Sequence, residues 1–112
     1  MKKTGDMKKF YHYSFPMQAA LLTVQTENKN TNVITVAWHT TISKKPPLYG
    51  VSIAPARYSH GLIEESKEFV INFAPYDLVE KVHFCGTRSG RNTDKIDETK
   101  LTLVPGLSLI HI

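Results

Sequence analysis

An arginine just before a predicted helix is the first feature of this sequence that could bind a charged ligand. Arg57 precedes Tyr58 and Ser59, and Ser59 is predicted to cap a short helix that ends near Lys67. A guanidinium beside a helix N-terminus brings a fork of donors, free backbone amides and positive potential together, which suits a phosphate monoester. The alternative is a surface arginine beside an ordinary capped helix, and the local sequence leaves both interpretations open.

A second polar segment carries positive charge among glycines. In CGTRSGRNTDK, residues 85–95, the glycines let the backbone approach a ligand, and the arginines and Lys95 add positive charge. The segment lacks the G-x-x-x-x-G-K-[ST] spacing of the phosphate-binding loop in nucleotide hydrolases. It is therefore either part of an anion site or a solvated loop.

The sequence lacks the motifs of several other enzyme classes. It has no G-x-G-x-x-G after a strand, no G-x-S-x-G elbow and no H-E-x-x-H. The five histidines form no clear ligand cluster with the single cysteine, so we predict no metal site. Cys85 lies on the apolar stripe of a predicted helix, and we expect a buried small hydrophobe rather than a nucleophile.

Two strands, residues 32–42 and 48–54, are expected to flank a turn at Lys44-Lys45-Pro46-Pro47 and to support these residues. In both strands one set of alternate side chains is bulky and the other is small or polar. The bulky set comprises Ile34, Val36, Trp38, Ile42, Tyr49, Val51 and Ile53. The pattern fits a core on one side and room for something flat on the other, or else an ordinary two-faced sheet whose small face meets solvent.

The remaining elements indicate a mainly β chain with short helices. Further strands are expected at residues 19–26 and 69–74, where Asn72 lies on the face opposite Phe69. A second helix is expected from Asp77 to Cys85, with Asp77 and Glu80 placed as a capping box. No fixed-period repeat is present, which excludes a solenoid.

Composition favours one globular domain and is compatible with anionic small-molecule ligands. The chain has 112 residues, 21% of them charged, and a net charge of +4 that comes largely from lysines among the first nine residues. The body of the chain has no basic stripe with interleaved aromatics, so we predict no nucleic-acid partner. One cysteine excludes an internal disulfide, and neither a secretory signal nor a membrane span is visible. We therefore expect a cytoplasmic protein with no membrane partner.

Both ends of the chain differ in character from its body. We expect residues 1–9 to be a disordered basic tail and residues 10–15, rich in aromatics, to be a packed arm of a domain that spans 10–106. Residues 107–112, LSLIHI, read like the in-frame translation of a transposon-end adapter used in preparing sequencing libraries, although a genuine apolar strand is the alternative. With too few strands to close a β domain, we expect a chain truncated at its C-terminus.

Three segments in this order, NVITVAWHTTISKKPPLYGVSI, ARYSHGLIEESKEFVINF and HFCGTRSGRNTDKI, resemble the flavin reductase-like family, which includes flavoredoxin-type proteins. The resemblance covers residues 15–104 and implies an FMN-binding split barrel, a Greek-key β-barrel, incomplete here at the C-terminus. It also implies FMN held noncovalently at the interface of a homodimer. The residues it assigns to cofactor binding are Ala37, Trp38, His39, Thr40, Thr41, Ser52, Ile53, Arg57, Tyr58, Ser59, Asn72 and Lys95.

The resemblance further implies an oxidoreductase in which NAD(P)H reduces bound flavin and the flavin passes electrons to free flavin, oxygen or a protein acceptor. The hydride chemistry belongs to the cofactor, so no catalytic acid, base or nucleophile is required of the protein. Two alternatives stay open. One is an FMN electron carrier without NAD(P)H reductase activity, and the other is a nonfunctional fragment or simple binding module.

Overall fold

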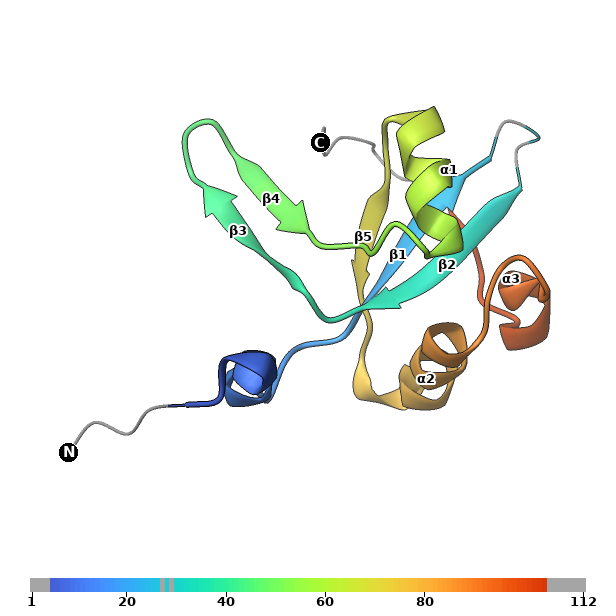
Figure 1. The fold of residues 1–112 in the computed structure, drawn as a ribbon. Helices are drawn as coiled ribbons and strands as arrows, with labels where there is room; N and C mark the ends of the chain where they lie inside the picture. Colours follow the sequence, from blue (N-terminus) through green and yellow to red (C-terminus); the bar gives the residue numbers. More distant parts are fainter. Residues whose placement is uncertain (1–4, 27, 29, 105–112) are drawn as a thin grey trace.

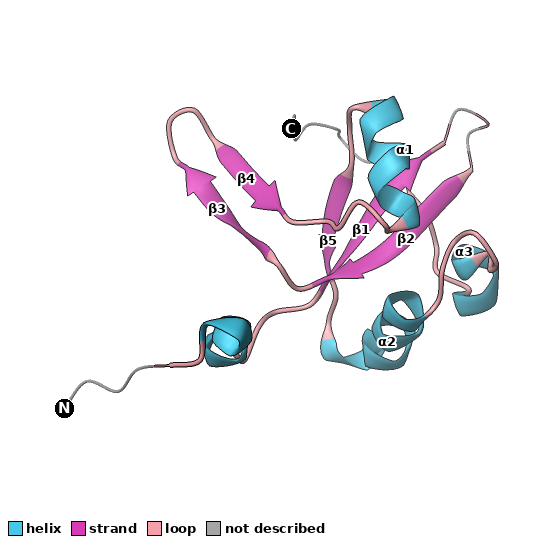
Figure 2. Ribbon diagram, in the orientation of Figure 1, coloured by secondary structure: helices cyan, strands magenta, loops and turns pink. Residues whose placement is uncertain are grey.

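A three-stranded antiparallel sheet forms the centre of the computed structural model, which describes residues 5–26, 28 and 30–104 (Figure 1). Its strands lie in the order β2-β1-β5, and a separate hairpin pairs β3 with β4. The strands are β1 (Ala20–Gln25), β2 (Thr31–Val36), β3 (His39–Ser43), β4 (Leu48–Val51) and β5 (Val70–Phe73). The helices are η1 (Met7–Ser14), α1 (Tyr58–Ser66), η2 (Tyr76–Leu78), α2 (Val79–Thr87) and α3 (Lys95–Thr99), where η denotes a 3₁₀ helix (Figure 2).

Both faces of the central sheet are covered by helices. On one face, Leu22 and Val24 of β1 pack with Ile63 of α1. On the opposite face, Leu21 and Val33 pack with Cys85 of α2. Because successive side chains of a strand point to opposite faces, β1 contributes to both hydrophobic clusters and is apolar along most of its length.

The predicted open face is wrong for β2. Val33 is buried under α2, and the Thr35 hydroxyl donates to the Val82 carbonyl of the same helix. The small side chains of this strand therefore face packed protein, neither a flat ligand nor solvent. Alternation reports which residues share a face, but it does not report what covers that face.

The predicted strand over residues 32–42 is two strands with a break at Ala37 and Trp38. After the break, β3 and β4 leave the central sheet as a hairpin (Figure 1). Trp38 is therefore 48% exposed and Ile42 is 61% exposed, although both share the bulky parity of core residues. The Ser52 amide donates to the Trp38 carbonyl at 2.9 Å and closes the base of the hairpin.

The predicted helices form, but their predicted caps do not. α1 begins at Tyr58 with Arg57 at the N-cap, and no side chain caps it, so Ser59 lies inside the helix. Asp77 lies in η2 rather than at the head of α2, and neither of these helices has a side-chain cap. Cys85 is buried on α2, as predicted.

The N-terminal segment differs from its prediction. From Met7 the chain forms η1, although disorder was expected through residue 9, and Phe10, Tyr13 and Phe15 are exposed rather than packed. Residues 1–4 of the predicted basic tail and all of residues 107–112 lie outside the described residues. Across the described part of the chain, no helix combines the length and apolarity needed to cross a membrane.

Candidate functional site

An open cleft of 680 Å³ lies along the β3–β4 hairpin, and we call it the hairpin cleft. Its lining residues are Met17, Gln18, Ala37, Trp38, His39, Thr40, Thr41, Ile42, Tyr49, Gly50, Val51 and Ser52. Six of the twelve predicted site residues are in this set: Ala37, Trp38, His39, Thr40, Thr41 and Ser52. The volume falls within the range of about 300–1,000 Å³ typical of small-molecule sites.

Small side chains and exposed hydroxyls characterise this cleft. A Cβ at Gly50 would lie 3.0 Å from two atoms of the Ile42 side chain, so the hairpin packs closely at this position. Thr40 and Ser52 are exposed, and their hydroxyls and nearby backbone groups can reach a polar ligand rim. Trp38 presents a large ring beside them, 6.2 Å between ring centroids from Tyr11 of η1.

His39 is the cleft residue whose ring is most fully engaged by protein groups. Its Nδ1 lies 2.6 Å from the Tyr49 hydroxyl, and its Nε2 lies 2.7 Å from the Gln18 carbonyl oxygen. The ring also lies 5.9 Å from the ring of Phe73 on β5. The predicted role of His39 in cofactor binding is therefore restricted to its backbone and ring face, because both ring nitrogens already have partners.

Three cationic side chains gather near the start of α1, and we call them the basic corner. Arg57 occupies the N-cap position, and Arg91 donates to the Ala56 carbonyl just before it at 3.2 Å. Lys95 is close enough for the Arg57 charge to lower its pKa, although burial is the larger cause of that lowering. Positive charge and the unpaired first amides of a helix therefore occur together here.

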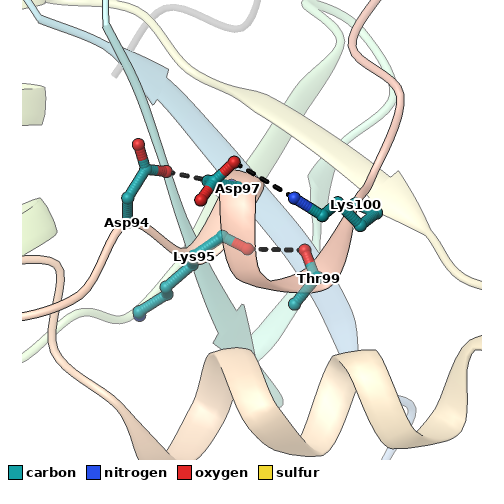
Figure 3. A network of polar contacts seen from close by, with 5 residues as sticks. All are labelled: Asp94, Lys95, Asp97, Thr99 and Lys100. Carbon is teal, nitrogen blue, oxygen red and sulfur yellow. Dashed lines mark hydrogen bonds and ion pairs between the residues drawn. The ribbon is translucent and has the colours of Figure 1, made fainter.

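Lys95 reaches this corner from α3 but is itself buried. It is 4% exposed, and its Nζ donates to the Val33 carbonyl at 2.9 Å and the Cys85 carbonyl at 2.8 Å. Around it, Asp94 caps α3 by accepting from the Asp97 amide, and the Thr99 hydroxyl donates to the Lys95 carbonyl (Figure 3). Two of the three N–H groups of the ammonium thus donate hydrogen bonds within the protein, while its charge adds to the local positive potential.

Ser59 and Tyr58 have different surroundings although they are neighbours on α1. Ser59 is 1% exposed, and its hydroxyl oxygen accepts a hydrogen bond from the side-chain amide of Asn32 at 2.7 Å. This bond connects α1 to β2. Tyr58 lines a second, polar cleft of 890 Å³ that also includes Asn32, Gly90, Arg91 and Lys95. The Arg91 guanidinium lies 5.5 Å from the centre of the Tyr58 ring, in cation–π range.

Two predicted site residues lie apart from these groups. The Ile53 side chain packs against the hydrophobic cluster under α1, which leaves its backbone available. Asn72 donates from β5 to the Leu21 carbonyl at 3.0 Å and lines a separate cavity of 430 Å³. The structure does not bring Asn72 together with the hairpin cleft.

Several residues of these clefts were not predicted by name. Tyr49 was assigned to the core because of its bulky parity, and Gln18 precedes the first strand, where no pattern marks it. Arg91 could have been found, since it lies in the glycine-bearing segment for which an anion site was one of the two open interpretations. No group of three or more histidine, cysteine, aspartate or glutamate side chains is arranged to hold a metal ion among the described residues.

Comparison with known proteins gives consistent matches over most of the chain. A family model described as a flavin reductase like domain matches residues 12–111. The flavoredoxin of Desulfovibrio vulgaris (Miyazaki F) aligns with a TM-score of 0.82 and 29% identity, covering 96% of this chain and 57% of that chain. An FMN-binding protein from Thermus thermophilus, solved with bound 1-cyclohex-2-enone, aligns with a TM-score of 0.74 and 37% identity, covering 87% of this chain and 53% of that chain.

The matches confirm the predicted fold class, a mainly β chain with short helices that shares part of a split-barrel fold. One matching structure is described as having a split barrel domain. Its sequence is 24% identical to this chain, so the match supports the shared fold and nothing beyond it. The chain spans about half the length of the curated relatives it matches first. One of them, from Archaeoglobus fulgidus, is 37% identical over 100 residues, which is 89% of this chain and 55% of the relative.

Proposed function

Because the chain belongs to the flavin reductase-like family, we propose that it binds FMN and serves as an oxidoreductase that moves electrons from NAD(P)H through the flavin to an acceptor. The acceptor is free flavin, oxygen or another protein. The observation that carries the proposal is the pairing of a cleft along the hairpin with a basic corner a few residues further along the chain. A flavin mononucleotide has a flat ring system at one end and a phosphate at the other, so it needs both.

The hairpin cleft suits the ring end of FMN. Its lining residues come mainly from the two hairpin strands, and the exposed hydroxyls of Thr40 and Ser52 can hydrogen bond the polar rim of a flat heterocycle. Trp38, half exposed beside them, adds an aromatic face that an apolar ring system can contact. We assign Ala37 to Thr41 and Ser52 to this end of the cofactor.

The basic corner suits the phosphate end. Arg57 is exposed at the N-cap of α1 and its side chain makes no cap hydrogen bond there, so we assign its fork of donors to a phosphate. The backbone amides of Tyr58 and Ser59 lie in the first turn of α1, where anions are favoured. Ser52 and Arg57 are five positions apart in the chain and hence within about 18 Å of each other, so one extended ligand can contact both.

In this proposal the protein binds and orients, and the cofactor supplies the redox chemistry. FMN, when bound, accepts a hydride and passes on electrons. Arg57 and the start of α1 hold the phosphate, and the hairpin orients the ring. Lys95 supports the site from inside through its charge, since its ammonium is held by the Val33 and Cys85 carbonyls.

We also propose that a homodimer completes the site. The exposed side chains of Trp38, Ile42 and Leu48 on the hairpin, together with Phe10 and Tyr13 of η1, are large and apolar. Aromatic and aliphatic side chains of this kind are typical of the buried centre of a protein interface. Sedimentation analysis with and without FMN tests this part, and a species of monomer mass under both conditions would contradict it.

An FMN electron carrier without NAD(P)H reductase activity is the second candidate, favoured by the match to a flavoredoxin at a TM-score of 0.82. Stopped-flow absorbance under anaerobic conditions separates the two functions. The reductase predicts bleaching of bound flavin by NADH or NADPH. No reduction by either nicotinamide would leave the carrier function.

The phosphate assignment has its own test. Arg57→Ala should weaken FMN by about 1.5–3 kcal/mol, the value of one hydrogen bond to a charged group, which is roughly 10- to 150-fold in Kd. Riboflavin, which lacks the phosphate, should bind both proteins equally. Arg88→Ala is the matched control, because Arg88 contacts Thr87 and the Phe84 ring on α2. An equal loss for FMN and riboflavin would remove Arg57 from this role.

A further inference from the structure

The β3–β4 hairpin has few connections to the rest of the protein. Its two strands pair with each other and with no other strand of the described chain. Most of its side chains are exposed or half-buried, and Val51 is its contribution to the cluster under α1. Buried apolar area therefore does little to fix the angle at which the hairpin leaves the central sheet.

Besides the packing of Val51 and a ring contact of Tyr49 with Phe73 of β5, one side-chain hydrogen bond joins the hairpin to a different part of the chain. Among the side-chain hydrogen bonds of the described residues, the bond from His39 to the Gln18 carbonyl is the one that joins the hairpin to a segment outside it. Gln18 lies in the segment just before β1. The His39 ring also packs against Phe73 of β5, so it contacts both the entry and the far edge of the central sheet.

The partners of His39 fix its tautomer. A carbonyl oxygen can only accept, so Nε2 must carry the proton that is donated to Gln18 at 2.7 Å. Neutral imidazole then leaves Nδ1 as an acceptor, and the Tyr49 hydroxyl donates to it at 2.6 Å. Tyr49 belongs to β4, so the ring ties both strands of the hairpin to Gln18.

The residues that line the hairpin cleft come from two parts of the chain, Met17 and Gln18 before β1 and residues of the hairpin and its base, and we call these two parts the cleft walls. The bond from His39 to Gln18 joins them. We propose that His39 is a positioning residue whose ring, held between the Tyr49 hydroxyl and the Gln18 carbonyl, sets the separation of the cleft walls. Its effect on FMN, which rests on the proposed function, is exerted through the hairpin rather than by a hydrogen bond to the cofactor.

The experiment measures the hairpin and the cofactor separately. Hydrogen exchange of the FMN-free protein reports the hairpin, and titration with FMN reports the cleft. His39→Ala should raise exchange of the backbone amides of β3 and β4 at least tenfold and weaken FMN. His39→Gln, whose terminal amide can still donate to the Gln18 carbonyl, should restore most of both. His83→Ala is the control, since His83 is exposed on α2 and should leave both readouts unchanged.

Two further measurements keep the proposal falsifiable if His39→Ala does not fold. Nitrogen-15 NMR of the wild-type imidazole should show the Nε2-protonated tautomer, and Tyr49→Phe should shift the Nδ1 resonance while the ring contact with Phe73 is kept. A ring without a proton on Nε2 would overturn the proposal, because it could not donate to the Gln18 carbonyl. So would weaker FMN binding with unchanged hairpin exchange, since that would make His39 a direct ligand. If FMN binds to no variant and not to the wild type, the proposed function fails while the exchange result still decides the role of His39.

Discussion

Lys95→Met removes a buried ammonium while keeping a side chain of similar length and volume. In the wild type, Nζ donates to the carbonyls of Val33 and Cys85. Cys85 is within the last four residues of α2, where carbonyls lack helical partners and a cation opposes the negative end of the helix dipole. The substitution therefore leaves two carbonyl groups without this donor and α2 without its C-terminal charge.

The magnitude follows from these contacts. Two hydrogen bonds to a charged group are together worth about 3–6 kcal/mol, and part of this is offset because the buried charge no longer has to be desolvated. We expect a net loss of about 2–3 kcal/mol in the free energy of unfolding. Urea unfolding followed by circular dichroism measures it, with an unchanged m-value as the check that the same surface is exposed.

Lys100→Met is the matched control for Lys95→Met. Lys100 directly follows α3, the helix that begins with Lys95, and its exposed ammonium pairs with Asp97 at 3.2 Å. Exposed ion pairs contribute about 0–1 kcal/mol, so the control should change stability little. Equal losses for the two variants, or a Lys95→Met protein as stable as the wild type, would refute the account of Lys95 as a donor to two buried carbonyls.

The pH dependence of the Lys95 effect has a defined sign. Burial lowers the pKa of Lys95 below the ordinary 10.5, with a smaller lowering from Arg57 and an opposing influence from Cys85. At pH values between the lowered pKa of Lys95 in the folded protein and its pKa of 10.5 in the unfolded chain, the unfolded chain binds more protons than the folded protein. The free energy of unfolding therefore increases as the pH rises towards 10.5. In a Cys85→Ala background, the stability advantage of lysine over methionine at position 95 should grow across that window. A constant or shrinking advantage would contradict the lowered pKa.

Four other predictions concern residues on and around the basic corner. Gly90→Ala should cost about 1–3 kcal/mol by overpacking, because the new Cβ would meet Asn32 Oδ1 and lie 2.7 Å from Tyr58 Cδ1. Gly61→Ala, with open space around its Cβ in α1, should instead stabilise by about 0.4–1 kcal/mol, and thermal melts compare the two. Asn32→Ala and Ser59→Ala should show a coupling of about 1 kcal/mol in a double-mutant cycle, and additive losses would mean that their hydrogen bond contributes nothing. Burial raises the pKa of the Cys85 thiol in the folded protein above the ordinary 9.0. The thiol therefore contributes stability below pH 9.0, and this contribution is lost as the pH rises from 9.0 to the pKa of the folded state. Cys85→Ala should abolish this alkaline loss of stability, which urea unfolding measures.

Local patterns in the sequence were sufficient for most of the strands and helices. The strand at 19–26 and the helix ending near Lys67 appear in the structure within one or two residues, because apolar β-branched runs and helix-breaking neighbours act over short distances. The Cys85 stripe was also readable, since a buried helical face repeats every three to four residues.

Features that depend on tertiary context could not be predicted in this way. The break between β2 and β3 at Ala37 and Trp38 contains no glycine or proline. The local sequence therefore has no strand-breaking residue from which the departure of the chain from the sheet could be predicted. Ser59 has the residue type of a cap, but burial against Asn32 decides its role. Lys95 was expected beside the flavin because of the family resemblance, whereas its two carbonyl partners come from β2 and α2, 62 and 10 positions away. Of the predicted cofactor residues, Ala37 to Thr41 and Ser52 converge on one cleft, whereas Asn72 does not.

The pairing of β1 with both β2 and β5 has a consequence for how such a protein can diversify. Everything from residue 37 to residue 69, including the hairpin and α1, leaves the sheet after β2 and returns at β5, so it forms one excursion anchored at both ends on the same central strand. Lengthening such an excursion costs little entropy, since the closure penalty grows only logarithmically with its length. Insertions at the hairpin tip can therefore reshape the cleft while the register of β1 with its two neighbours is inherited unchanged. Ligand preference and framework stability are in this way open to separate selection.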